Sequence, residues 1–447
     1  MEELQKNDVI ETEVTSLGIN GEGISHLDGK TIFVRGALPG ERVRAKIILV
    51  KPTFDIAILE KIISPSPDRV IAPCPHFGKC GGCDIQHLCY DQQLVYKQEN
   101  IAQTLQKIGK IDVPVRPVIA SDKVLRYRNK VSFPVREGKE GVKIGLFAKG
   151  SHRVVETSDC LLQYEWNSTL IAVLKKFIAE RSLTGYNEDT GKGDIRHLVV
   201  REVGEKIYIT LVTNRKIDCA PLYKELSALY SDCALYQNVN RRRDNVILGD
   251  EWYLVGGEEN TSVDAMSFSL HPAGFYQVND YIREQMYALV TSLCDGSVAI
   301  EAYSGAGLLS ARLARKASHV YGIEINEQAH SAAQKLAKDN GISNFTPILG
   351  DVSKKLGAVL AKVRGENTFI VVDPPRTGLA RDAAVMLGES EVNNIVYISC
   401  NPATLARDLA IITTYGYEVT LIQPYDMFPQ TSNVETVVVL RKQNSQP

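Results

Sequence analysis

From about residue 270 onward, the chain repeats one pattern of hydrophobic and polar positions. Short runs of apolar, often β-branched residues stop at a glycine, an acid or a cysteine, and a stretch with helical spacing follows. Each apolar run predicts a buried strand, and strand, turn and helix in repetition predict an open α/β sheet. The predicted strands end near Ile300, Glu324, Leu349, Asp373 and Ser399.

The first 64 residues follow a different pattern, with short alternating segments between glycine-rich turns. Strands at this spacing predict a small β-barrel, a shape that often holds nucleic acids but serves many other purposes. The expected strands are Val9–Val14, Thr31–Val34, Arg42–Ile48 and Ile56–Ile63.

The middle of the chain mixes both periodicities, which predicts a second α/β or α+β unit. We expect a helix over residues 90–110 before this unit and helices over 166–180 and 220–229 within it. The expected strands of the unit are 131–135, 142–147, 197–201, 206–212 and 245–248. Together these patterns divide the chain into residues 1–64, 65–270 and 271–447.

Composition narrows the class of protein. The chain has 447 residues, 44% of them hydrophobic and 23% charged, with a net charge of −2, so no overall basic field indicates a nucleic-acid partner. The polar amino end has no signal-peptide core, and no apolar run is long enough to span a membrane. We therefore expect a cytoplasmic protein without a membrane partner, and a monomer by default.

Nine cysteines in a reducing compartment indicate metal-binding or catalytic thiols before disulfides. Cys74, Cys80 and Cys83 stand close together, with two glycines between the last pair that allow a tight turn. A closed metal site needs a fourth thiolate, and Cys160 is the best candidate, since the nearer Cys89 lies in a helical run. The spacing alone does not decide between zinc and an iron–sulfur cluster.

Two other features have both a functional and a simpler interpretation. The stretch 123–130 holds four cations around a tyrosine, which suits RNA phosphates and bases or equally a charged strand edge. Cys400 follows a strand, at the edge where open α/β sheets bind ligands. A cysteine at such a position more often has only a packing role, as a small buried residue. A catalytic role becomes the better interpretation if reactive or ligand-binding side chains lie near it.

The residues expected near Cys400 do include side chains that can bind a ligand. Glu301, Glu324, Asp351 and Asp373 stand at or near four successive strand ends, and Gly305 and Gly307 form a tight turn after the first. A carboxylate such as Glu324 can accept two ribose hydroxyls. The turn lacks the third glycine of a dinucleotide fingerprint, and an acidic rim repels phosphates but tolerates a sulfonium. The pattern favours S-adenosylmethionine over a dinucleotide.

Four longer motifs resemble the RNA uracil-5-methyltransferase family. They are Phe275-Tyr-Gln277-Val-Asn, Asp373-Pro-Pro-Arg-Thr-Gly, Tyr397-Ile-Ser-Cys400-Asn-Pro and the segment from Asp426-Met-Phe-Pro to Glu435. The beginning of the chain, Gly21-Glu-Gly-Ile-Ser-His-Leu-Asp-Gly-Lys, resembles a TRAM domain, which implies RNA contact. With the cysteine set, the resemblance covers nearly the whole chain and is nearest to the branch that methylates 23S rRNA.

This resemblance implies a Rossmann-like class I methyltransferase domain preceded by a TRAM barrel and a central domain with a [4Fe–4S] cluster. The cluster ligands would be Cys74, Cys80, Cys83 and Cys160. Gln277, Tyr303, Gly305, Gly307, Glu324, Asp351 and Asp373 would lie around S-adenosylmethionine. Gln430 and Asn433 depart from the family, which often has histidines at these two positions.

The implied reaction is methylation of uridine C5 in RNA, with no DNA partner. A thiolate that adds to C6 makes C5 nucleophilic, and we assign this role to Cys400. Glu435 is then the base that removes the C5 proton. The target must be unpaired or flipped out of its stack. Alternatives are a tRNA substrate, a non-catalytic rRNA-binding assembly factor, a cytosine-5 methyltransferase and an iron–sulfur radical enzyme; the last two fit the cysteine motifs poorly.

Overall fold

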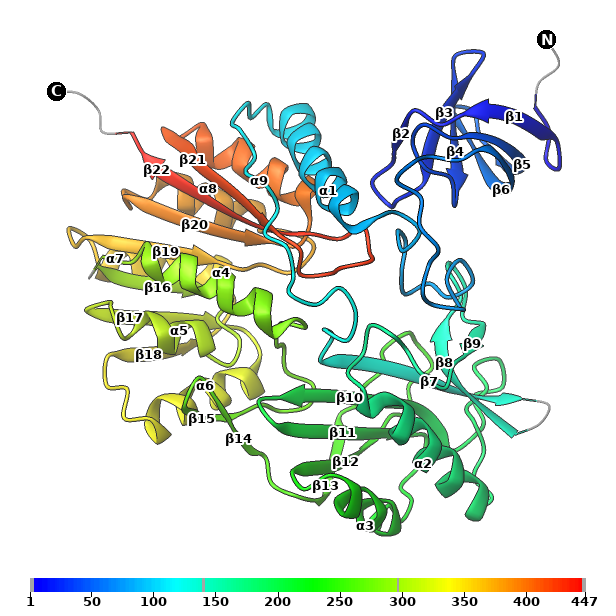
Figure 1. Cartoon of the computed structure of the whole chain (residues 1–447). Coiled ribbons are helices and arrows are strands. Elements are labelled where there is room, and N and C mark those ends of the chain that lie inside the picture. Colours follow the sequence, from blue (N-terminus) through cyan, green and yellow to red (C-terminus); the bar gives the residue numbers. More distant parts are fainter. Residues whose placement is uncertain (1–3, 139–140, 296, 444–447) are drawn as a thin grey trace.

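The computed structural model describes residues 4–138, 141–295 and 297–443. Figure 1 shows three parts: a small β-barrel set apart from the rest, a central unit, and a large carboxyl-terminal unit. Among the described residues, no helix combines the length and the apolar character needed to cross a membrane.

The amino-terminal part is a six-stranded sheet in the order β1-β5-β6-β4-β3-β2. Alternate residues of β5 are buried, as a strand with one solvated face requires. The sheet curls until β1 contacts β3, and apolar side chains fill its interior. The predicted small barrel is therefore present, with two further strands, β2 and β3. The strands are β1 (Val9–Glu13), β2 (Ser16–Leu17), β3 (Gly23–Leu27), β4 (Lys30–Arg35), β5 (Arg42–Val50) and β6 (Phe54–Ser64).

The central unit is a mixed seven-stranded sheet in the order β13-β12-β11-β10-β7-β8-β9, with α2 and α3 in the apolar core beside it. Its strands are β7 (Lys130–Gly138), β8 (Gly141–Phe147), β9 (Val154–Glu156), β10 (Ile195–Val203), β11 (Lys206–Thr213), β12 (Cys233–Val239) and β13 (Glu251–Gly256). Its helices are α2 (Trp166–Glu180) and α3 (Ala220–Leu229).

One predicted strand of the central unit is wrong. Residues 245–248 form a loop, because the side chain of Asn240 donates hydrogen bonds to the backbone oxygens of Val246 at 2.7 Å and Ile247 at 2.9 Å. The prediction also missed β9, β12 and β13. Of these, β12 is buried on both faces and so shows no polar alternation.

The carboxyl-terminal unit is a seven-stranded sheet in the order β18-β17-β16-β19-β20-β22-β21. The first five strands are parallel, and β22 lies antiparallel between β20 and β21. This arrangement confirms the predicted α/β fold. The strands are β16 (Val298–Ala302), β17 (His319–Glu324), β18 (Phe345–Leu349), β19 (Thr368–Val372), β20 (Asn394–Ser399), β21 (Tyr417–Tyr425) and β22 (Glu435–Lys442).

Helices cover both faces of this sheet. Val371 of β19 faces the core that includes α4, α5 and α6, whereas the adjacent Val372 faces the core of α7, α8 and α9. Because successive strand residues point to opposite faces, the apolar runs in the sequence supply both cores. The helices are α4 (Asp280–Ser292), α5 (Leu308–Leu313), α6 (Glu327–Asp339), α7 (Val352–Lys362), α8 (Arg381–Glu389) and α9 (Pro402–Thr413).

The helix α1 (Tyr90–Thr104) and the π-helical turn η1 (Leu105–Gly109) pack on the carboxyl-terminal unit, although the chain order places them before the central one. Ile101 and Leu105 are buried in the same core as α9 (Figure 1). Beyond η1, the backbone N–H of Ile119 donates to the oxygen of Pro424 at 2.9 Å. The hairpin of β14 (Asn260–Val263) and β15 (Met266–Ser269) also joins this unit, against α6.

Candidate active site

The carboxyl ends of the parallel strands bring the predicted acids to one edge of the sheet. Glu324 ends β17, Asp351 precedes α7, Asp373 follows β19 and Cys400 follows β20. Glu301 lies one residue before the end of β16, is buried, and accepts a hydrogen bond from the Ser310 hydroxyl of α5. The structure therefore places every strand-end residue of the sequence analysis along one rim.

The turn after β16 needs unusual backbone angles. Gly305 has φ +53° and Gly307 +81°, and a Cβ atom on Gly307 would lie 3.0 Å from Ala333 Cβ and from the Phe345 ring. Tyr303 also has a positive φ, +68°, which is uncommon for a residue with a side chain. The turn directs the N–H of Gly305 to a carboxylate oxygen of Glu324 at 2.8 Å. The glycines thus fix the backbone beside the acid of the next strand.

The side chain of Glu324 is held by two backbone groups. One oxygen accepts from Gly305 N–H, and the other accepts from Asn326 N–H at 2.7 Å. Each carboxylate oxygen retains a second lone pair for a hydroxyl group. Asp351 caps α7 through the N–H of Ser353 at 2.8 Å, and this hydrogen bonding lowers the pKa of Asp351. Both acids are therefore preorganised at the rim by hydrogen bonds.

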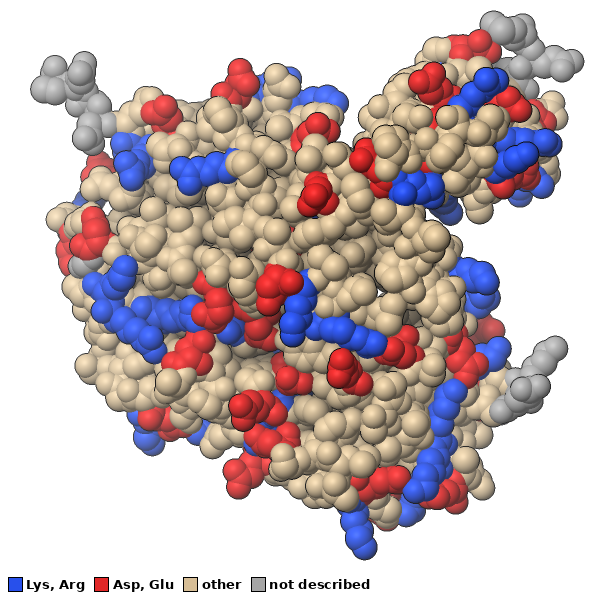
Figure 2. Space-filling view, viewed as in Figure 1, with Lys and Arg blue, Asp and Glu red and all other residues tan. Residues whose placement is uncertain are grey.

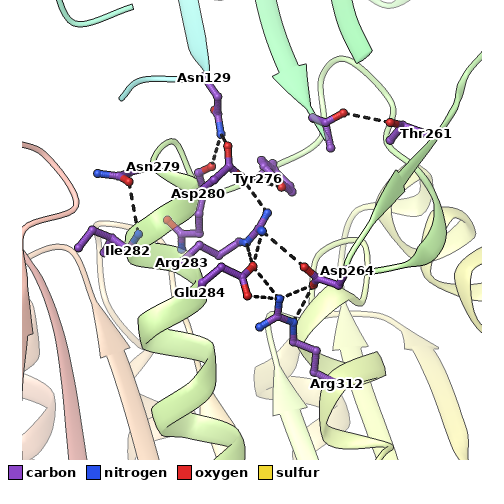
Figure 3. A network of polar contacts seen from close by, with 12 residues as sticks. Asn129, Thr261, Asp264, Tyr276, Asn279, Asp280, Ile282, Arg283, Glu284 and Arg312 are labelled. Carbon is purple, nitrogen blue, oxygen red and sulfur yellow. Dashed lines mark hydrogen bonds and ion pairs between the residues drawn. The ribbon is translucent and has the colours of Figure 1, made fainter. Parts of the chain in front are cut away.

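Gln277 is buried at the entrance to this unit, and its backbone is fixed from the central unit. The side chain of Asn129 donates to the Gln277 oxygen at 2.9 Å and to Asp280 at 3.1 Å. Asp280 in turn accepts from Arg283 at 2.9 Å, within the ion-pair network that continues to Arg312 (Figure 3). This network is not predictable from the sequence, because single polar residues in helices give no signal of their long-range partners.

The antiparallel strand β22 brings Glu435 to the rim. Ser399 pairs with Thr436 across β20 and β22, so continuation of this register by one residue sets Cys400 opposite Glu435. Opposed residues of an antiparallel pair have side chains on the same face, at Cβ separations of about 5 Å. Cys400 and Glu435 therefore lie close together, although 35 positions of sequence separate them.

Cys400, Glu435 and Asp373 form a cluster of acids with one cation. Burial raises the pKa of Asp373; burial and then Asp373 raise the pKa of Glu435 well above its usual range. Burial, followed by the Glu435 carboxyl, raises the pKa of the Cys400 thiol to about 11, while the Arg376 guanidinium acts to lower it. The pocket thus disfavours negative charge and suits the approach of a cationic group.

Arg376 and Asn433 complete the pocket and were not predicted as site residues. Arg376 donates to the side-chain oxygen of Asn433 at 2.5 Å, and its backbone oxygen accepts from Asn401 at 3.0 Å. Asn401 also caps α9 by accepting from the N–H of Ala403 at 3.1 Å. Asn433, one of the two departures from the family motif, therefore orients Arg376, the cation beside Cys400 and Glu435.

We expect alkylation of Cys400 by iodoacetamide to be slow at neutral pH, because a thiol with a pKa of about 11 is mostly protonated there. Between pH 7 and 9 the rate should rise about tenfold per pH unit, since only the thiolate reacts. Replacement of Arg376 by Gln should slow the reaction further at each pH, whereas Arg381→Gln, at an exposed position, should not. Peptide mass spectrometry measures Cys400 separately; a rate independent of pH would contradict the expectation.

Three of the four predicted metal ligands, Cys74, Cys80 and Cys160, line one small cavity beside the central unit. Cys83 lies near them: burial raises the pKa of its thiol, and the other three thiols raise it further. Cys89 lies outside, with its thiol 3.8 Å from Asp68. Within the described ranges, no three His, Cys, Asp or Glu side chains are arranged to hold a metal ion.

The basic stretch 123–130 has fewer cations free to bind RNA than its sequence indicates. Arg126 forms an ion pair with Asp159, and Arg128 donates to the backbone oxygen of Lys130 at 3.2 Å. Burial and the nearby Arg201 and Arg128 lower the pKa of Lys130 to about 7. Arg126, Arg128 and Lys130 are therefore engaged or buried within the protein and are less accessible to RNA.

Comparison with known proteins gives concordant matches along the chain. The tRNA (uracil-5-)-methyltransferase family matches residues 89–443, and the TRAM domain matches residues 3–58. An uncharacterized RNA methyltransferase of Halalkalibacterium halodurans is 39% identical over 99% of this chain and 98% of its own length. A similar protein of Clostridium acetobutylicum is 36% identical, with 98% of each chain covered.

A solved structure matches the whole fold. The Pyrococcus abyssi tRNA (uracil-54, C5)-methyltransferase, in complex with S-adenosyl-L-homocysteine, superposes with a TM-score of 0.78 at 27% identity. The match covers 96% of this chain and 100% of that one. All three parts of the molecule therefore have counterparts in one enzyme.

Proposed function

Because the chain belongs to the tRNA (uracil-5-)-methyltransferase family, we propose that it methylates uridine C5 in 23S rRNA through a covalent adduct of Cys400. The observation that carries this proposal is the register of β20 and β22, which sets a thiol opposite a buried carboxyl group. An unstacked uracil between them would present C6 to the thiol and C5 to the acid.

Cys400 acts first in the proposed reaction. Its thiolate adds to C6, so that the S–C6 bond forms and the electrons of the C5–C6 double bond move toward O4. C5 would then attack the methyl carbon of a bound sulfonium donor, so that the C5–CH3 bond forms, the S–CH3 bond breaks and the donor leaves as a neutral thioether. The high pKa of Cys400 in the free protein means that the thiolate has to be stabilised when the pocket fills, and the positions of Arg376 and of a cationic donor support this.

Glu435 completes the reaction. As the C5–H bond breaks, its carboxylate takes the proton; the C5–C6 double bond reforms and the C6–S bond to Cys400 breaks. Burial of Glu435 favours this role, because a carboxylate with a raised pKa is a stronger base than an exposed one.

The donor would lie along the rim. We assign Glu324 to the ribose hydroxyls, Asp351 to the adenine side, and Asp373 to the junction between donor and target base. Gln277, Tyr303, Gly305 and Gly307 would shape the rest of the donor site, with the backbone of Gln277 fixed by Asn129. An acidic rim suits a sulfonium by charge.

We also propose that Cys74, Cys80, Cys83 and Cys160 hold a [4Fe–4S] cluster. Such a cluster would link the segment after the barrel to the turn before α2, and the methyl transfer needs no electron from it. The assignment is supported by three thiols that line one cavity and by Cys83, which lies close enough for those thiols to raise its pKa.

The cluster has a direct test. Protein purified without oxygen is expected to contain about four irons per chain, as this cluster type requires. Cys83→Ser and Cys160→Ser should lower the iron content, whereas Cys89→Ser, outside the cavity, should retain it. Zinc in place of iron, or equal iron in all variants, would contradict the assignment.

The RNA would contact the barrel and the neighbouring edge of the central unit. Figure 2 shows Lys and Arg side chains in both places, interspersed with acids. Because Arg126, Arg128 and Lys130 contact the protein itself, the barrel is the better candidate for holding the RNA backbone.

A tRNA is the second candidate substrate. The Pyrococcus abyssi enzyme, which is named for tRNA uracil-54, shares the architecture of this chain over its whole length. The barrel and the central unit are thus compatible with either RNA, and the preference for 23S rRNA rests on the sequence motifs and the cysteine set.

The test is transfer of labelled methyl groups from S-adenosylmethionine to unmodified transcripts of 23S rRNA and of tRNA, with the modified position mapped. We expect label at uridine C5 in 23S rRNA. Label only in tRNA would retain the chemistry and replace the substrate. No label in either RNA would instead indicate a non-catalytic RNA-binding protein.

A further inference from the structure

The loop that precedes Glu435, residues 426–434 between β21 and β22, is held by a distant part of the chain. Three consecutive backbone oxygens of this β21–β22 loop accept hydrogen bonds from the segment 84–127. Phe428 accepts from Lys97 at 3.0 Å, and Pro429 accepts from the Tyr127 hydroxyl at 3.0 Å. Gln430 accepts from the N–H groups of Asp84 and Ile85 at 3.1 and 3.2 Å.

Gln93 of α1 is the centre of this contact. Its side-chain oxygen accepts from the backbone N–H of Gln430 at 3.1 Å, and its amide nitrogen donates to the Gln430 side chain at 3.1 Å. The same nitrogen lies 2.8 Å from the oxygen of Leu88 and 3.2 Å from that of Ile85. Only 1% of Gln93 is exposed, so water cannot replace these partners.

The conformation of Gln430 shows why the loop needs this support. Its φ is +70°, in the left-handed region that residues with a side chain rarely adopt. Such a conformation is strained and persists only where surrounding contacts determine it. The Gln430 side chain therefore contacts Gln93 instead of pointing toward the target uracil.

Both ends of the loop are fixed as well. At its start, Lys97 and Asp426 form a fully buried ion pair at 2.5 Å, and the Tyr90 hydroxyl donates to Asp426 at 2.8 Å. Near its end, the Ser432 hydroxyl donates to Asp84 at 3.3 Å. Asp84 directly follows Cys83, so the segment that carries Cys80 and Cys83 also supports the β21–β22 loop.

We propose that Gln93 is a positioning residue for proton removal by Glu435. It acts through Gln430: the amide pair fixes a strained turn five residues before Glu435, the first residue of β22, and this places the Glu435 carboxyl at C5. Cys400 is held independently by β20 and the cap of α9, so addition and methyl transfer should not need Gln93. This inference rests on the proposed function.

The test compares Gln93→Met with Gln98→Met. The substrate is a transcript of 23S rRNA, or a tRNA transcript if only tRNA accepts methyl groups. Methionine retains the volume of glutamine but removes its hydrogen bonds. Gln98 is the matched control, because it lies on the same helix and donates only to Val115, at 2.8 Å, away from the loop. We expect Gln93→Met to lower kcat by at least about tenfold with KM nearly unchanged, since small displacements of a catalytic group are costly.

The covalent adduct separates positioning from general damage. With ordinary RNA, Gln93→Met should accumulate a methylated protein–RNA adduct on denaturing gels, because its slow step is proton removal. With 5-fluorouridine RNA, which has no C5 proton to lose, adduct formation should match the wild-type rate. Gln98→Met should behave as wild type in both assays.

If Glu435→Gln traps the adduct, so that the proposed role of Glu435 holds, either of two results would overturn the inference about Gln93. One is a kcat for Gln93→Met equal to that of Gln98→Met; the other is equally slow adduct formation with 5-fluorouridine RNA. If Glu435→Gln itself traps no adduct, the proposed role of Glu435 fails instead. Should Gln93→Met not fold, Ser432→Ala removes a second support of the same loop near the surface, and the same adduct assays apply.

Discussion

Replacement of Cys400 by Ala is expected to abolish methyl transfer, with a loss of at least about a thousandfold in kcat, because the covalent route has no other nucleophile. The alanine leaves the fold intact, since Cys400 is only half-buried and follows the end of β20. Binding of S-adenosylmethionine should remain, because the donor residues lie on other strand ends. Labelled-methyl transfer and donor binding by calorimetry measure the two effects separately.

The matched control is Cys89→Ser, another half-buried thiol, which lies outside both the pocket and the cysteine cavity. It should transfer methyl groups at the wild-type rate. Cys400→Ser is expected to be nearly as inactive as the alanine variant, because a hydroxyl ionises far less readily than a thiol. Substantial transfer by Cys400→Ala would rule out the covalent mechanism and leave the fold assignment unaffected.

Glu435→Gln is expected to stop the reaction one step later. The amide cannot take the C5 proton, so kcat should fall by about a hundredfold or more while the adduct still forms. The enzyme should then migrate with its RNA on a denaturing gel, and the trapped base should already carry the labelled methyl group.

This outcome distinguishes a base from a residue that only shapes the pocket. Glu418→Gln is the control: it changes an exposed acid on β21 of the same sheet and should leave turnover unaltered. Loss of adduct in Glu435→Gln would show that Glu435 acts before methyl transfer, for example by accepting the thiol proton of Cys400.

The sequence was most informative where the site is local. Cys400, Asp373 and Glu324 each stand at the end of an apolar run, and parallel strands bring such ends to one edge without further information. Gly305 and Gly307 have the positive φ angles that their place in a strand-to-helix turn indicates. The α/β fold followed from the same runs.

The residues that escaped prediction depend on contacts far apart in sequence. Gln93 and Gln430 are 337 positions apart, and Arg376 and Asn433 are 57 apart. Polar residues such as glutamine or asparagine have no pattern that indicates which backbone group they will meet. The prediction of a strand at 245–248 was wrong for a related reason. The side chain of Asn240 donates a hydrogen bond to the backbone of that loop, and strand propensity takes no account of such a bond.

The packing of α1 on α9 also affects how the molecule folds and how its parts can be exchanged in evolution. The buried pair Lys97–Asp426 joins residues 329 positions apart, so the catalytic unit closes only after nearly all of the chain is available. Contacts at such separations slow folding, because a long loop must be ordered before they form. A gene fragment beginning at residue 271 would encode the methyltransferase sheet without α1 and would expose the apolar surface that Ile101 and Leu105 cover. The segment 90–119 and the carboxyl-terminal sheet are therefore expected to be inherited together. The barrel should accompany them, because the Tyr96 hydroxyl of α1 donates to the Gly18 oxygen at 2.8 Å and Leu38 packs with Ile85 and Leu88.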